Sequence, residues 1–263
     1  MDEVIVISVV RDWAMYEKCL GKNPNVQDCR LIPVDNREKN ERISVCYNRA
    51  LEGLEDGMSR WLVFCHEDFQ PLENVADVLS LANRALIHGP IGGRLEHRRP
   101  WLLGGFWPGV FAGVVEMSEK DGSCEETFGT LVPASTRVDT VDCQCLIVHS
   151  SLVEKYRLRF DECLSFDLYA EDLCLDAKLS HGIETAILPF RCRHYSRGTV
   201  LPRFFEQKAY LDAKYPRAEA FGCVGYTIGG GRTLVRRLQK RLRRFLDKKM
   251  PWTVRLVLRM ADF

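Results

Sequence analysis

Three polar residues follow directly on an apolar segment near the end of the first quarter of the chain. Residues 61–65 read WLVFC, and His66, Glu67 and Asp68 come next, before the chain turns at Pro71. Imidazole and carboxylate groups in such a cluster ligate divalent cations or transfer protons. The alternative is structural, because carboxylates also accept amide hydrogen bonds near the start of a helix. Both explanations require that the apolar segment is a buried strand that ends here.

The segments that would position these residues alternate between strands and helices. The expected strands are 4–10, 30–35 and 61–65, and the expected helices are 14–20, 40–54 and 73–89. The strands are apolar and rich in β-branched residues, whereas the helices have apolar residues at helical spacing, the last closed by Gly89. This alternation predicts an α/β fold with a mostly parallel central sheet flanked by helices.

Beyond residue 90 the composition changes. Residues 90–140 are rich in glycine, proline and tryptophan. The elements expected from here on are strands at 109–117, 144–151 and 184–190 and helices at 169–182 and 201–214. Gly182 is expected to end the helix before it, as glycine commonly does.

The predicted sheet has one edge at which ligands are expected. In an open α/β sheet, ligands bind beyond the carboxyl ends of the parallel strands. The first three strands end at Arg11, Asp35 and His66–Asp68, so these groups should share one rim. No glycine-rich phosphate-binding loop follows the first strand. A phosphate bound there would need a divalent cation, for which Asp68 is the natural ligand.

Composition narrows the class of protein. The chain has 263 residues, 46% of them hydrophobic, and a net charge of +1, which is typical of a soluble globular protein. The eleven cysteines are an odd number and lie mostly in apolar runs, so we expect reduced core residues in a cytoplasmic protein. The start, Met-Asp-Glu, lacks the basic region of a secretory signal, and no apolar run reaches the length of a membrane-spanning helix.

The charge is unevenly distributed along the chain. Residues 232–263 hold eleven of the 37 basic residues and two of the 36 acidic ones, which leaves residues 1–231 with a net charge of −8. Leucines at helical spacing between these basic residues predict an amphipathic helix. We therefore expect a domain over 1–215, followed by a basic helical C-terminal extension over 216–263.

Six segments in this order resemble the GT-A fold of nucleotide-sugar glycosyltransferases, most of all the family-2-like group. They read ISVVRDW, SVCYNRALE, FCHEDF, VDCQCLIVHSSLVEKYRLRFDE, YAEDLCLDAKLSHG and RHYSRG, and they span about residues 4–200. The resemblance implies a metal-dependent enzyme that moves a sugar from a UDP-sugar, or another nucleoside diphosphate sugar, to an acceptor hydroxyl. It favours inversion at the anomeric carbon.

The resemblance also implies a metal site. His66–Glu67–Asp68 stands where the family carries Asp-x-Asp, whose second acid ligates Mn²⁺ or Mg²⁺ at the donor's diphosphate. Here His66 replaces the first acid, so Asp68 is the implied ligand and His66 a further one. A histidine in the region of RHYSRG completes the metal shell in many members, which implies His194. A histidine with only a structural role is the alternative at that position.

Further roles follow from the same resemblance. In YAEDL, Asp172 is implied as the general base, with Glu171 beside it and Asp167 as a second candidate; acids in a first helical turn also suit the helix dipole. Asp142 is a candidate for holding a sugar hydroxyl. The residues implied at the nucleotide are Val10, Arg11, Asp35, Tyr47 and Asn48, with Arg197 at the phosphates. Ordinary packing is the alternative for Tyr47.

The partners of the basic extension stay open at this stage. Residues 232–259 suit an anionic membrane surface, on the inner face of the membrane, where the acceptor would be lipid-linked. They also suit docking on the acidic body of this chain or of a second copy in a homo-oligomer. Nucleic acid is disfavoured, because no recognition motif is present.

Two other functions compete with transfer. The first is a non-catalytic UDP- or nucleotide-binding module with a GT-A fold, which the substitution at His66 makes credible. The second is a nucleotidyltransferase, which is disfavoured because VVRDWAMYEK contains no glycine for a triphosphate loop.

Overall fold

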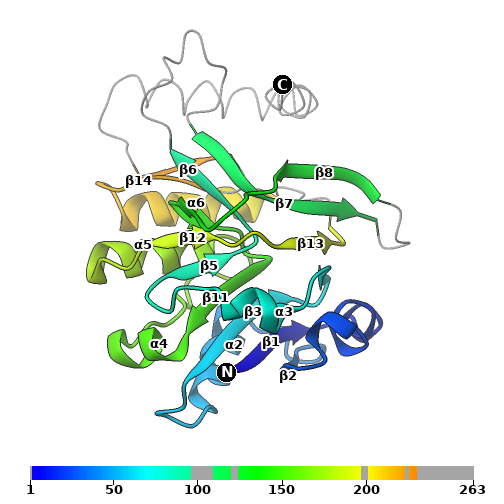
Figure 1. Ribbon diagram of the computed structural model, residues 1–263. Coiled ribbons are helices and arrows are strands. Elements are labelled where there is room, and N and C mark those ends of the chain that lie inside the picture. The colour runs from blue at the N-terminus through cyan, green and yellow to red at the C-terminus, as the bar shows by residue number, and fades with distance from the viewer. Residues whose placement is uncertain (1, 96–108, 120–123, 197–200, 223–224, 230–263) are drawn as a thin grey trace.

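The computed structural model describes residues 2–95, 109–119, 124–196, 201–222 and 225–229. Within these residues the chain forms a mixed α/β structure with a larger and a smaller sheet (Figure 1). The strands of the larger sheet are β1 (Glu3–Val10), β2 (Arg30–Asp35), β3 (Arg60–His66), β5 (Ile87–Gly89), β9 (Thr136–Val138), β11 (Cys145–His149) and β12 (Thr185–Ile187). Those of the smaller sheet are β4 (Phe69–Pro71), β6 (Ile91–Leu95), β7 (Gly109–Ser118), β8 (Cys124–Thr130), β10 (Thr140–Val141) and β13 (Arg191–His194).

The larger sheet has the order β2-β1-β3-β11-β5-β12-β9. β2 and β3 flank β1 in parallel, and β12 is parallel to β5. β11 runs antiparallel between β3 and β5, and β9 is antiparallel at the edge. The sheet is therefore mostly parallel, as the alternation of elements predicts, and the carboxyl ends of β1, β2 and β3 share one rim.

Helices cover both faces of the larger sheet. The helices are α1 (Trp13–Tyr16), a π-helical turn (Glu17–Gly21), a 3₁₀ turn (Pro24–Val26), α2 (Ile43–Glu52), α3 (Val75–Ser80), α4 (Ser150–Tyr156), α5 (Tyr169–His181) and α6 (Pro202–Lys214). Side chains alternate along β1, so Ile5 and Ile7 pack on the face covered by α2 and α5, and Val4 and Val6 pack on the face covered by α1 and α3. This explains why residues 4–10 are apolar at nearly every position.

The smaller sheet brings the end of β13 to the rim. Its strands follow the order β10-β6-β7-β13-β4, with β8 paired to β7. β13 pairs antiparallel with β4, and in this register His194 lies opposite Phe69. Because Phe69 follows Asp68 directly, the pairing brings His194 beside the end of β3.

Several expected elements are confirmed and two are corrected. β1, β2, β3, α2, α5 and α6 lie where expected, and Gly182 ends α5 with φ +70°. The expected helix at 73–89 is wrong beyond Ser80, because the Asn83 side chain and carbonyl accept hydrogen bonds that turn the chain, and Ile87–Gly89 then joins the sheet. The expected strand at 144–151 ends at His149, where α4 begins.

The segment after α6 contributes to the described body. β14 (Glu219–Phe221) and β15 (Thr227–Gly229) form a hairpin, and the fully buried Phe221 accepts a hydrogen bond from Thr140 through its carbonyl. The boundary at 215 stays a prediction. Residues 232–259, for which a membrane or protein partner is expected, lie outside the described residues, as do most of the tryptophan- and glycine-rich residues 100–109. In the described part of the chain, none of the helices has both the length and the apolarity that crossing a bilayer requires.

Candidate metal centre

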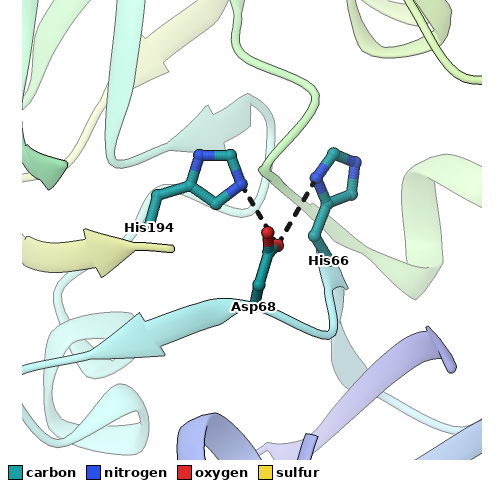
Figure 2. Close-up of side chains that lie close together, drawn as sticks. All are labelled: His66, Asp68 and His194. Atoms are coloured by element: carbon teal, nitrogen blue, oxygen red, sulfur yellow. Dashed lines mark ion pairs between the residues drawn. The ribbon is translucent and has the colours of Figure 1, made fainter. Parts of the chain in front are cut away.

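Three side chains converge where β3 and β13 end (Figure 2). His66 is the last residue of β3, Asp68 lies in the short link between β3 and β4, and His194 is the last residue of β13. The Tyr195 amide donates a hydrogen bond to the Asp68 carbonyl at 3.1 Å, which fixes the two strand ends together. Three residues that are far apart in the sequence thus form one cluster, the rim cluster His66, Asp68 and His194.

The distances in the rim cluster suit one shared cation. His194 Nε2 lies 3.1 Å and His66 Nδ1 3.9 Å from Asp68 Oδ1. One ligand atom from each residue lies within 4.8 Å of the others. Atoms that bind one cation at roughly 2.0–2.6 Å lie about 3–4 Å from one another. The side chains are 11–23% exposed, so an ion from solvent can reach them.

Tyr169 sets the orientation of the His66 ring. The Tyr169 hydroxyl donates its single proton to the Cys143 carbonyl, at 2.6 Å. It lies 2.9 Å from His66 Nε2, and its oxygen can only accept there, so Nε2 carries the proton. Burial lowers the pKa of His66 to about 4, so the ring is neutral at pH 7. The lone pair of Nδ1 therefore faces Asp68, which is the arrangement of a metal ligand held by a partner on its other nitrogen.

His194 presents the second unsatisfied nitrogen. Its Nε2 is buried and makes no hydrogen bond within the described residues, although Asp68 Oδ1 is near. The contact is an ion pair without the alignment of a hydrogen bond. Burial opposes charge on His194, but the Asp68 carboxylate outweighs it and raises the pKa of this ring. Two imidazoles and one carboxylate, with one nitrogen unbonded and one lone pair aimed at an anion, fit a divalent cation.

Glu67 has a structural role, in agreement with the alternative raised for this cluster. Its carboxylate accepts hydrogen bonds from the amides of Arg11 and Asp12. Burial raises the pKa of Glu67, and the two amides offset part of that rise. This contact ties the end of β3 to the end of β1 and leaves Asp68 as the acid of the rim cluster.

The remaining rim residues are placed as follows. Arg11 is exposed at the end of β1, while the side chain of Val10 lies in the core and only its backbone reaches the rim. Asp35 ends β2 and pairs with Arg37 at 2.6 Å, and its hydrogen bonds from Arg37 lower its pKa to about 2. Arg11 and Asp35 thus stay accessible for a nucleotide. Arg197 lies outside the described residues.

The expectation that Tyr47 and Asn48 contact the nucleotide is wrong. Tyr47 is fully buried against Phe64, and its hydroxyl donates to the Cys65 carbonyl at 3.0 Å. Asn48 is buried as well and exchanges hydrogen bonds with the backbone of Phe160. Both side chains face the core because they lie on the apolar side of α2, so neither reaches the rim.

The expectation that Asp172 is the general base is also wrong. Asp172 is 1% exposed, its Oδ1 accepts a hydrogen bond from the Tyr215 hydroxyl at 2.9 Å, and it lies 2.8 Å from Lys214 Nζ. Lys214 also pairs with Asp161 at 2.6 Å. These contacts attach α6 to α5, and within the described residues both oxygens of the Asp172 carboxylate are bonded to α6 or the residue after it.

Glu171 and Asp142 interact electrostatically with each other. Glu171 is 1% exposed, and burial followed by the charge of Asp142 raises its pKa to about 8. The Cys143 thiol donates to its carboxylate at 3.2 Å. At pH 7 Glu171 is therefore mostly protonated, which suits a proton-holding group better than a base. Asp142 raises the pKa of both histidines of the cluster through its charge. Its role beside the donor sugar stays a prediction.

The sequence reasoning missed Tyr169 and Phe166. Tyr169 orients His66, and Phe166 stacks on the His66 ring with centroids 5.3 Å apart. The available signal was their position, since Phe166 precedes Asp167 and Tyr169 begins the YAEDL motif. An aromatic residue at that point reads as core packing, and only the fold brings both rings to the end of β3.

Comparisons with known proteins give distant matches. No family model matches the chain. A protein of Fuscovulum blasticum named "ATP synthase subunits region ORF 6" is 29% identical over 246 residues, which cover 86% of this chain and 90% of that protein. Among solved structures, A197 from STIV is 15% identical, with a TM-score of 0.42 over 74% of this chain and 86% of that one.

A fragment of S. aureus TarS in complex with UDP is also similar to this chain. It is 11% identical, with a TM-score of 0.47 over 83% of this chain. The chain spans 66% of that fragment, just under two thirds of its length. Both TM-scores lie below 0.5, so the function proposed below rests on the geometry of the rim cluster and on the order of the sequence motifs.

Proposed function

We propose that this protein is a metal-dependent glycosyltransferase that moves a sugar from a nucleoside diphosphate sugar, with UDP as the expected nucleotide, to an acceptor hydroxyl with inversion. The observation that carries the proposal is the rim cluster, in which the unbonded Nε2 of His194 and the lone pair of His66 Nδ1 face the Asp68 carboxylate. The cluster lies where β3 ends, on the rim where an α/β sheet binds its ligands.

His66, Asp68 and His194 would hold the ion. Imidazole ligands suit Mn²⁺ better than Mg²⁺, which prefers oxygen ligands throughout, so Mn²⁺ is the preferred member of the expected pair. When bound, such an ion neutralises charge on the diphosphate that leaves with the nucleotide. A cation is needed because Asp68, Asp142 and Asp35 make this rim acidic.

The other residues of the rim would position the donor. The exposed Arg11 and the accessible Asp35 lie at the ends of adjacent parallel strands, within reach of a nucleotide bound along the rim. Glu67 holds the Arg11 amide to the end of β3, so the nucleotide-binding and metal-binding ends of the site are joined by one contact. Phe166 and Tyr169 pack against the His66 ring.

Isothermal titration with UDP tests the proposal. We expect UDP to bind in the presence of Mn²⁺ and to lose at least about 100-fold in affinity when Mn²⁺ is replaced by a chelator. Asp68→Ala should show the same loss with Mn²⁺ present, because the ion loses its only carboxylate. Asp2→Ala is the matched control, since Asp2 also lies beside a histidine, His149, but at the amino end of β1. Equal UDP affinity with and without Mn²⁺ contradicts the proposal.

A further inference from the structure

The loop that leads into α5 lies directly against a residue of the rim cluster. Phe166 stacks on the His66 ring at an interplanar angle of 27°, and it is 43% exposed. The Arg203 guanidinium, from the first turn of α6, lies 4.6 Å from the centroid of the Phe166 ring. Residues 165–168 therefore form a wall of the site beside the His66 ring.

This wall holds one carboxylate that a substrate can reach. The Asp167 side chain is 22% exposed, and Arg203 Nε donates a hydrogen bond to its Oδ2 at 3.0 Å. Its neighbours Glu171 and Asp172 are each 1% exposed. Asp167 directly follows Phe166, whose ring stacks on His66, so the backbone of Asp167 lies beside the rim cluster.

The backbone around Asp167 is held in a costly conformation. Leu168 has φ +65°, in the left-handed region that is unfavourable for residues other than glycine. The Gln207 side chain of α6 accepts hydrogen bonds from the amides of Ser165 and Asp167, at 3.0 and 3.3 Å, and holds the loop in place. Strain that the surrounding structure maintains is common at functional sites.

We propose that Asp167 is the general base of the transfer reaction, an inference that rests on the function proposed above. The acceptor oxygen forms a bond to the anomeric carbon of the donor sugar while its proton passes to the Asp167 carboxylate. The bond from that carbon to the diphosphate oxygen breaks, and its electron pair leaves with the nucleoside diphosphate. Arg203 positions the carboxylate, and Phe166 forms the floor on which the acceptor lies.

The electrostatic environment agrees with this role. Burial raises the pKa of Asp167, and Arg203 offsets only part of the rise. The Asp167 carboxylate is therefore more basic than an ordinary aspartate, which favours proton transfer to it. Glu171, by contrast, is mostly protonated at pH 7, and Asp172 is enclosed by Lys214 and Tyr215.

Release of UDP from UDP-sugars, with water as the acceptor, tests the inference on the full chain. A panel of UDP-glucose, UDP-galactose and their N-acetyl derivatives is incubated with Mn²⁺, and free UDP is measured. We expect Asp167→Asn to lower kcat by at least about 100-fold, as the loss of a general base does. The Mn²⁺–UDP affinity should stay within about twofold of the wild type, and Asp167→Glu should retain more turnover than Asp167→Asn.

Three other carboxylate variants make the result specific. Asp176→Asn, at an aspartate of α5 whose carboxylate accepts a hydrogen bond from Ser180, is the matched control and should keep the wild-type turnover. Turnover that survives in Asp167→Asn, or that is lost selectively in Glu171→Gln or Asp172→Asn, overturns the inference and leaves the proposed function intact. Wild-type protein that binds no UDP with Mn²⁺, or binds it and releases none from any UDP-sugar, overturns the proposed transfer and this inference together.

Discussion

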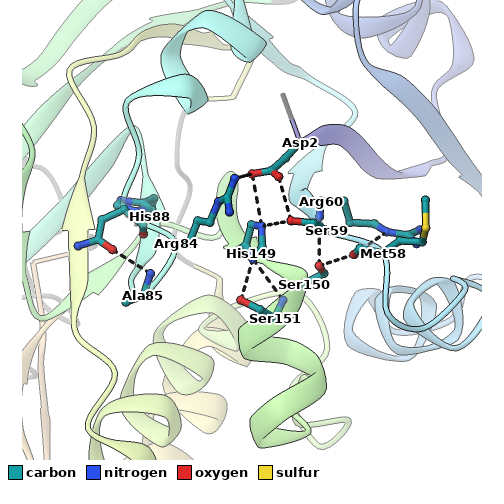
Figure 3. A network of polar contacts seen from close by, with 11 residues as sticks. Asp2, Met58, Ser59, Arg60, Arg84, Ala85, His88, His149, Ser150 and Ser151 are labelled. Carbon is teal, nitrogen blue, oxygen red and sulfur yellow. Dashed lines mark hydrogen bonds and ion pairs between the residues drawn. The ribbon is translucent and has the colours of Figure 1, made fainter.

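Two groups of histidine and aspartate lie near opposite ends of the parallel strands β1 and β3, and they are bonded very differently. The rim cluster, His66, Asp68 and His194, lies at the carboxyl ends of the parallel strands (Figure 2). At the other end, His149 Nε2 lies 3.5 Å from the Asp2 carboxylate, just before β1 begins (Figure 3). By distance and residue type alone, both are candidate sites.

The pair at the amino end is fully engaged by its neighbours. Arg84 lies 2.6 Å from one Asp2 oxygen, and the Ser59 hydroxyl donates to the other at 2.9 Å. His149 Nδ1 accepts from the Ser151 amide, in the position of a helix cap, and lies 2.7 Å from the Ser151 hydroxyl. The network attaches the start of β1 to α4, which is a structural task.

The rim cluster lacks that completeness. His194 Nε2 has no hydrogen bond within the described residues, and Tyr169 fixes the other histidine with its lone pair toward Asp68. An ion pair without an aligned hydrogen bond leaves the His194 nitrogen and the Asp68 carboxylate imperfectly satisfied, and an ion bound between them would satisfy both. The comparison teaches that the bonds a histidine lacks are more informative than the aspartate it approaches.

The largest expected effect separates the two pairs by reciprocal substitution. His194→Ala should weaken Mn²⁺-dependent UDP binding by at least about 100-fold, because the ion loses one of its three ligands. His149→Ala should leave UDP binding unchanged and lower Tm by about 5 °C or more, since it removes a buried ring and its hydrogen bonds. Isothermal titration calorimetry with UDP and Mn²⁺ measures the affinity of both variants, and differential scanning calorimetry measures their Tm. A loss of UDP affinity of similar size in His149→Ala would erase the distinction.

A smaller effect sharpens the role assigned to Tyr169. Tyr169→Phe keeps the ring that packs against Tyr47 and Phe160 but removes the oxygen that accepts from His66. We expect Mn²⁺–UDP affinity to fall about tenfold, in the range typical for loss of a group that orients a metal ligand. Ser59→Ala, which removes a hydroxyl beside His149, is the control at the other end and should bind as the wild type does. Unchanged affinity in Tyr169→Phe would mean that the hydroxyl does not fix the His66 ring.

The smallest effect concerns stability and its dependence on pH. Burial raises the pKa of Glu171 to about 8 in the folded protein, against 4.5 as its ordinary value. The folded state then binds more protons than the unfolded state between pH 4.5 and 8, so the stability contributed by this group falls as pH rises through that window. Glu171→Gln should therefore be more stable than the wild type at pH 8, and the advantage should shrink towards pH 5. Urea unfolding at the two pH values measures it, and a pH-independent difference would show that Glu171 is ionised in the fold.

Much of the fold could be predicted because local patterns decide it. The apolar runs of β1 and β3 and the helical spacing in α2 and α5 determine those elements wherever the rest of the chain lies. Ile87–Gly89 could not be predicted, because its strand conformation depends on pairing with β11 and β12, which come from distant parts of the sequence. The smaller sheet was not predicted as a sheet for the same reason, although its strand β7 was expected over 109–117.

Some residues of the candidate site could likewise be predicted from local sequence, and others depend on contacts between distant segments. His66, Asp68 and His194 could be proposed from residue type and motif order, and the structure brings them together. Asp172 could not be assigned correctly from YAEDL, because adjacent acids in one helical turn differ only in what packs against them. Its partner Lys214 lies on α6, 42 positions away in the sequence. Tyr47 was misassigned because a polar group on a helix can bond inward to a carbonyl as well as outward to a ligand.

The most direct test of the central claim is anomalous diffraction from crystals grown with UDP and Mn²⁺. We expect one manganese peak per chain, bound by Asp68, His194 Nε2 and His66 Nδ1, with the UDP diphosphate on the same ion. A diphosphate bound elsewhere on the protein, or an Asp68 carboxylate bonded only to protein groups with no peak beside it, would contradict the account.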